Sequence, residues 1–142
     1  MTRVNWSRLA LGGLLASAIA FVTDGFLHEK LIHRKWASLV EGLHITPPEH
    51  APSAFVYFAV FELGRGFVPV FLYAMMRARF RPGPGTAALA GVIGWVAFSL
   101  TGPAQFIPLG FFSNELWCAI GLYQLVTSIL ATIAGAAVYR EA

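Results

Sequence analysis

An acidic and a basic side chain, Glu62 and Arg65, lie near the middle of a long apolar run that covers residues 53–76. A run of that length crosses a bilayer as a helix, because about 20 apolar residues span its hydrocarbon core. Charged groups at such depth are costly, so by default they indicate a buried site. Their i, i+3 spacing also places both groups on one helix face, where they neutralise each other. The sequence therefore predicts a buried ionic contact, which by itself names no reaction.

Further polar residues are expected at a comparable depth in two other apolar runs. Asp24 and His28 end a stripe of small residues at i, i+4 spacing that starts at Gly12. Such a stripe lets another helix approach closely, so we expect Asp24 and His28 to face protein. Gln124 lies ten residues into the last run, and Glu62 lies about 14 Å below the start of its own. We predict an intramembrane polar site made of Asp24, His28, Glu62, Arg65 and Gln124.

Two interpretations of this polar site remain open. In the first, Glu62 and Arg65 pair with each other and with Asp24, and the pairing fixes how the helices dock. In the second, the site is a proton- or ion-responsive pocket, or a polar ligand site that opens outward. The docking interpretation is favoured for a protein of only 142 residues. For Asp24 alone, close to the membrane interface, simple solvation is the expectation.

Histidines and carboxylates also raise the question of a metal site. Asp24 and His28 are spaced i, i+4, as are Glu29 and His33, and further such residues occur within 44–50. Two ligands on one helix face form only part of a site, and His28 and His33 point about 140° apart around a helix. We expect no metal, no cofactor and no catalytic residue, since the sequence contains no phosphate loop, nucleophile elbow or zinc-protease motif.

The composition is that of an integral membrane protein. Hydrophobic residues make up 57% of the chain and charged residues only 12%, whereas soluble domains carry about 25% charged residues. Four runs are continuously apolar instead of alternating, so helices are expected in each. The runs cover about 9–28, 53–76, 86–107 and 114–139. The predicted fold class is all-α: a four-helix transmembrane bundle that forms a single integral membrane domain, 1–142.

Proline and glycine cannot continue a helix and separate the runs. The breaks lie at 44–52, 81–85 and 102–110. Residues suited to cap the helices that follow are Ser53, Thr86, and Ser113 or Asn114. Between the first two runs, apolar residues recur at helical spacing over 29–43, which predicts a short amphipathic helix. We expect it to extend the first span or lie in the outer interface, or to form a small helical cap over the bundle.

The basic residues predict an orientation. Six lie at the N-terminus, in the second loop and at the C-terminus, against three in the first loop and none in the third. The positive-inside rule then places both termini in the cytoplasm. Met1–Ala18 also has the basic start and small-residue pattern of a cleaved signal peptide. Because the apolar run continues through Val22, we expect this segment to remain as a span.

Three stretches resemble small bacterial four-span membrane proteins that are classified as domains of unknown function. The first is Thr23-Asp24-Gly25-Phe26-Leu27-His28. The second is Gly91-Val92-Ile93-Gly94-Trp95 with the loop Gly102-Pro103-Ala104-Gln105-Phe106-Ile107-Pro108. The third is Glu115-Leu116-Trp117 with Ala134-Gly135-Ala136-Ala137-Val138-Tyr139. The resemblance covers most of the chain and implies a four-helix bundle in the bacterial inner membrane, with no activity attached.

We expect a non-enzymatic accessory or structural protein whose partners are the lipid bilayer and a second copy or another membrane protein. The alternative is a small oligomeric transporter or channel subunit, coupled to protons or ions through Glu62 and Arg65. A membrane enzyme or carrier that uses Asp24, His28 and Glu62 is weakest, because no catalytic constellation is complete. No nucleic-acid partner is expected, since the basic residues sit where membrane topology requires them.

Overall fold

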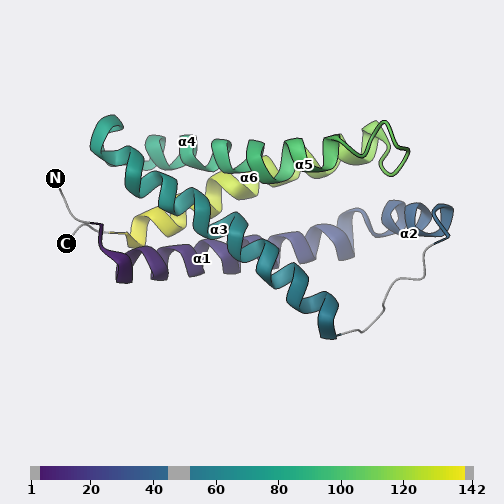
Figure 1. Cartoon of the computed structure of the whole chain (residues 1–142), viewed down its shortest axis with the longest axis horizontal. Coiled ribbons are helices and arrows are strands. Elements are labelled where there is room, and N and C mark those ends of the chain that lie inside the picture. The colour runs from purple at the N-terminus through teal and green to yellow at the C-terminus, as the bar shows by residue number, and fades with distance from the viewer. Residues whose placement is uncertain (1–3, 45–51, 140–142) are drawn as a thin grey trace.

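The computed structural model of the chain describes residues 4–44 and 52–139, and every regular element within these ranges is helical. Three helices are long and continuous: α1 (Trp6–Phe26), α3 (Pro52–Phe80) and α6 (Asn114–Val138). A fourth is built from α4 (Pro84–Trp95), the π-helical segment η2 (Val96–Leu100) and α5 (Thr101–Ala104). All four are long and apolar enough to cross a membrane. The chain is therefore a multi-pass membrane protein with an all-α, four-helix architecture (Figure 1).

The four spans run in alternating directions along the long axis of the molecule (Figure 1). The start of α1, the turn between α3 and α4, and the end of α6 lie together at one end. The short helix α2 (His33–Gly42) and residues 105–113 lie at the other end. α1 packs against both α3 and α6, so the three helices form a common core.

The helices approach most closely where small residues face one another. Gly12 of α1 lies against Gly135 of α6, and a Cβ added to either glycine would overlap the backbone of the other. Gly66 of α3 leaves room in the same way for the backbone of Ser17 in α1. The small-residue stripe of the first span is therefore the face on which both neighbouring helices pack.

The first helix is longer than predicted at both ends. It begins at Trp6 instead of residue 9 because Asn5 caps it, the side-chain oxygen of Asn5 accepting a hydrogen bond from the N–H of Arg8 (3.1 Å). Beyond Phe26 it continues as the π-helical segment η1 (Leu27–Leu31).

The structure tests each of the predicted N-caps. Ser113 is confirmed, because its hydroxyl oxygen accepts a hydrogen bond from the N–H of Leu116 (3.1 Å) at the start of α6. Ser53 is wrong, because α3 already begins at Pro52. A proline suits the first helical position, where its missing N–H would have had no partner within the helix.

The third predicted cap, Thr86, is also wrong. Its helix begins two residues earlier, at Pro84. The hydroxyl of Thr86 donates to the carbonyl oxygens of Phe80 (3.2 Å) and Arg81 (2.8 Å), at the end of the preceding helix. Arg81 adopts a left-handed conformation (φ 67°), which turns the chain between α3 and α4. Thr86 therefore holds this turn together instead of starting a helix.

The predicted break at 102–110 starts too early. Gly102 and Pro103 belong to the last turn of the third span, which ends at Ala104. From residue 105 onward the helix is interrupted as predicted, and turns lead to the start of α6. A proline within the final turn is tolerated because the residues just before that turn, Val96–Leu100, are π-helical, which interrupts the regular hydrogen-bond ladder.

The predicted amphipathic helix is α2, and it combines two of the placements expected for it. It follows α1 through η1, so it extends the first span (Figure 1). Its apolar residues Trp36 and Leu39 pack with Leu27 and Leu116, so it also covers the start of α6. An exposed ion pair between Lys35 and Glu115 joins the same two helices.

Two glycines of α1 provide a matched test of this packing. Gly12→Ala places a methyl group on the backbone of α6 and should lower the free energy of unfolding by about 1–3 kcal/mol, as overpacking does. Gly25→Ala places the same methyl group in open space and should leave stability unchanged or raise it by up to about 1 kcal/mol. Unfolding in detergent measures both, and equal tolerance would contradict the assigned α1–α6 contact.

Candidate functional site

Arg65 lies where three helices meet, and only 5% of it is exposed. Its Nη1 donates to Oδ2 of Asp24 on α1 at 2.5 Å and to Oε1 of Glu62, one turn earlier on α3, at 2.9 Å. Nε2 of Gln124 on α6 donates to the same Oδ2 of Asp24 at 2.6 Å. A single carboxylate oxygen therefore accepts hydrogen bonds from two other helices. We call Asp24, Glu62, Arg65 and Gln124 the polar cluster.

The depth of the polar cluster follows from helix lengths. Glu62 lies ten residues after the start of α3 and Gln124 ten residues after the start of α6. At about 1.5 Å per residue, each lies about 15 Å along its helix. Since both helices start at the same end of the molecule (Figure 1), the two side chains reach the same level, and Asp24 meets them from α1.

Asp24 is buried, with 8% of its surface exposed, so the expectation of a solvated Asp24 is wrong. The helix does not end just after it, as the predicted span did, but continues through η1 to Leu31. Asp24 is thereby kept away from the end of the span. Its carboxylate instead lies against Arg65 and Gln124.

His28 does not join the polar cluster. Its Nδ1 donates to the backbone carbonyl oxygen of Asp24 (2.9 Å), and its ring meets that of Trp36 edge-on, with centroids 5.2 Å apart. The π-helical segment begins at Leu27, between the two residues. The ring of His28 thus lies against the backbone of Asp24 and against Trp36, and among the described residues it makes no hydrogen bond with the side chains of the polar cluster.

Two further hydrogen bonds lie beside the polar cluster, and the sequence patterns do not predict them. The hydroxyl of Tyr123 donates to the carbonyl oxygen of Thr23 (2.9 Å), which joins α6 to α1. The hydroxyl of Ser17 lies 3.1 Å from the carbonyl oxygen of Leu63, which joins α1 to α3. Tyr123 directly precedes Gln124, and Thr23 directly precedes Asp24. This adjacency to two predicted site residues is the only sequence feature that points to the Tyr123–Thr23 hydrogen bond.

The charges of the polar cluster do not balance. Two carboxylates, Asp24 and Glu62, share one guanidinium, which leaves one negative charge in excess when all three groups are ionised. Four buried polar atoms also have no hydrogen-bond partner among the described residues: Oδ1 of Asp24, Oε2 of Glu62, and Nε and Nη2 of Arg65. Each such atom costs about 1–3 kcal/mol. The cluster therefore joins three helices and still has unused capacity for a donor and an acceptor.

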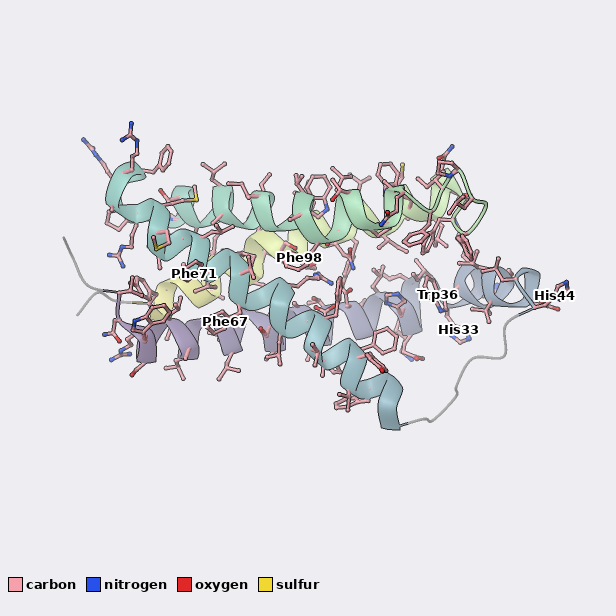
Figure 2. All side chains as sticks on the ribbon, viewed as in Figure 1. His33, Trp36, His44, Phe67, Phe71 and Phe98 are labelled. Carbon is pink, nitrogen blue, oxygen red and sulfur yellow. The ribbon has the colours of Figure 1, made fainter. Side chains whose placement is uncertain are left out.

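A metal centre does not arise from the described part of the chain. Within it, no group of three or more His, Cys, Asp or Glu side chains is placed to hold a metal ion. Figure 2 shows His33 and His44 on and just after α2, at the far end of the molecule from the start of α1. The polar cluster can hold helices together, accept a proton or bind a cation. It places no nucleophile next to a base.

Comparisons with protein-family models, with curated proteins and with solved structures found no match. The resemblance to small four-span bacterial membrane proteins therefore stays a prediction.

Proposed function

We propose that the chain is a non-enzymatic accessory protein of the membrane, in which the polar cluster holds three helices in one arrangement. The observation that supports this role is the shared oxygen Oδ2 of Asp24, which accepts from Arg65 at 2.5 Å and from Gln124 at 2.6 Å. In lipid, helices gain no hydrophobic stabilisation from each other, so packing and interhelical hydrogen bonds determine how they associate. Buried ion pairs are best attested as devices that select one arrangement over others.

The proposal includes association with a second copy of the chain or with another membrane protein. Residues 55–61, near the start of α3, are apolar and largely exposed, and Tyr57 and Phe58 are 76% and 64% exposed. Figure 1 shows this part of α3 diverging from the other helices. A helix that is apolar on all sides offers lipid or a protein partner a large contact surface.

We further propose a bacterial inner-membrane location with both termini in the cytoplasm. The end of the molecule where α1 starts also carries Arg8 and the arginines of the α3–α4 turn, as the positive-inside rule requires of a cytoplasmic face. In a Cys118→Ser background, a membrane-impermeant maleimide added to intact cells should label Ser38→Cys on α2. It should leave Ser7→Cys unlabelled. Labelling of Ser7→Cys alone would reverse the orientation.

A proton- or ion-coupled transporter subunit is the second candidate function. It is favoured by the excess carboxylate of the polar cluster and by Oε2 of Glu62, which has no partner among the described residues. Ionisable residues within membrane spans often mark proton or ion pathways. The two functions make opposite predictions for Glu62, because docking through Asp24 does not require its charge.

Ion flux into proteoliposomes, followed with a pH-sensitive dye, separates the two candidates. The accessory role predicts no flux above that of protein-free vesicles, for the wild type and for Glu62→Gln alike. A transporter predicts a flux that Glu62→Gln abolishes while the protein still folds. Glu115→Gln, which changes an exposed glutamate at the start of α6, is the matched control. Flux that survives in Glu115→Gln and is lost in Glu62→Gln would overturn the accessory role.

A further inference from the structure

A groove of about 350 Å³ lies between α1 and α3, on the side where Leu14 and Val22 are exposed. Its volume falls within the range of small-molecule sites, about 300–1,000 Å³. The groove is lined by apolar side chains of both helices, with Ser17 and Glu62 as its two polar residues. A ligand would therefore enter sideways from the lipid, between two membrane-spanning helices.

Only one of the two polar residues has hydrogen-bonding capacity to spare. The hydroxyl of Ser17 is already within hydrogen-bonding distance of the carbonyl oxygens of Gly13 (2.8 Å) and Leu63 (3.1 Å). Oε1 of Glu62 accepts from Arg65, but Oε2 has no partner among the described residues, and the side chain is only 7% exposed. Glu62 thus lines the groove, but its unused acceptor Oε2 is buried behind the groove wall, so a ligand reaches it once the side chain turns toward the groove.

The charge of the polar cluster restricts what this acceptor can bind. Arg65 is shared between Glu62 and Asp24, so an ionised cluster carries one negative charge in excess. An ammonium group would supply an N–H donor and cancel that charge, and charge-assisted hydrogen bonds are about twice as strong as neutral ones. An alcohol would supply a donor without the charge, and a carboxylate would add repulsion in a low-dielectric setting.

The remaining walls of the groove suit an alkyl chain. Phe21 of α1 and Phe55 of α3 both line it, and their rings meet edge-on with centroids 5.5 Å apart. Ala18 and Ala59 also line it and leave room between the helices because their side chains are small. An apolar chain in this groove would touch lipid on its open side and hydrocarbon side chains on the others.

We propose that the α1–α3 groove binds a lipid-phase amphiphile whose protonated amine donates to Oε2 of Glu62 and whose alkyl chain lies along the apolar walls. This binding site does not rest on the accessory role. The docking contacts use Oδ2 of Asp24 and Oε1 of Glu62, whereas the ligand uses Oε2 and the groove. Failure of one proposal therefore leaves the other standing.

Three probes of equal chain length test the proposal on the purified full chain in neutral detergent micelles. Decylammonium, decanol and decanoate are compared by equilibrium dialysis against protein-free micelles, with native mass spectrometry for stoichiometry. Decylammonium should bind in a one-to-one complex about tenfold or more tightly than decanol, a difference of about 1.4 kcal/mol. Decanoate should bind most weakly. Equal binding of all three amphiphiles would overturn the proposal.

Two pairs of variants locate the site. Ala18→Phe fills the groove and should weaken decylammonium binding about tenfold or more, while Ala119→Phe, at an exposed alanine of α6 outside the groove, should not. Glu62→Gln should lower decylammonium binding to the level of decanol, while Glu115→Gln should leave it unchanged. If Glu62→Gln fails to fold, the alanine pair still decides. Undiminished binding by a folded Ala18→Phe variant would contradict the assigned groove.

Discussion

One guanidinium nitrogen, Nη1 of Arg65, donates to carboxylates on two helices, and the remainder of the core is arranged around that contact. If α1 and α3 separate, Arg65 keeps Glu62 on its own helix, but Asp24 of α1 loses its cationic partner, and a buried charge without a partner is destabilising by several kcal/mol. Gln124 then brings α6 to the same oxygen of Asp24. Because lipid cannot solvate these groups, any other arrangement of the three helices would expose or separate charges, and the polar cluster therefore selects one packing.

Close packing of the backbones makes this contact geometrically accessible. Gly66, next to Arg65, lies against the backbone of Ser17, and Gly12 lies against Gly135 of α6. Larger side chains at these positions would move the helices apart and lengthen the hydrogen bonds between Asp24 and its donors. The small residues and the polar cluster thus depend on each other. The small residues allow the helices to approach closely, and the polar cluster fixes how far each helix is shifted along its neighbours. The α1–α3 groove lies between the same two helices, and the rings of Phe21 and Phe55 form part of its wall.

Much of this architecture follows from the sequence, and the departures have local causes. The lengths of the apolar runs predict the four spans. The similar depth of four polar residues within these runs predicts that they lie at one level: Asp24, Glu62, Arg65 and Gln124. His28 is spaced i, i+4 from Asp24, which predicts a place in the polar cluster, but its ring instead contacts the backbone of Asp24 and the ring of Trp36 on α2, a contact that spacing within one helix does not predict. Asp24 was expected to be solvated because the end of the first helix was placed too early. The Tyr123–Thr23 bond depends on a rotation of α6 that an apolar run leaves undetermined.

The most direct test of the docking account is a double-mutant cycle on Asp24 and Arg65, read as the free energy of unfolding in detergent. Asp24→Asn and Arg65→Met should each be destabilising, and the double variant should lose less than the sum of the two, with a coupling of about 1–3 kcal/mol. The exposed pair Lys35 and Glu115 serves as the control cycle and should show no measurable coupling. Strictly additive losses at Asp24 and Arg65 would contradict the claim that their contact holds α1 and α3 together.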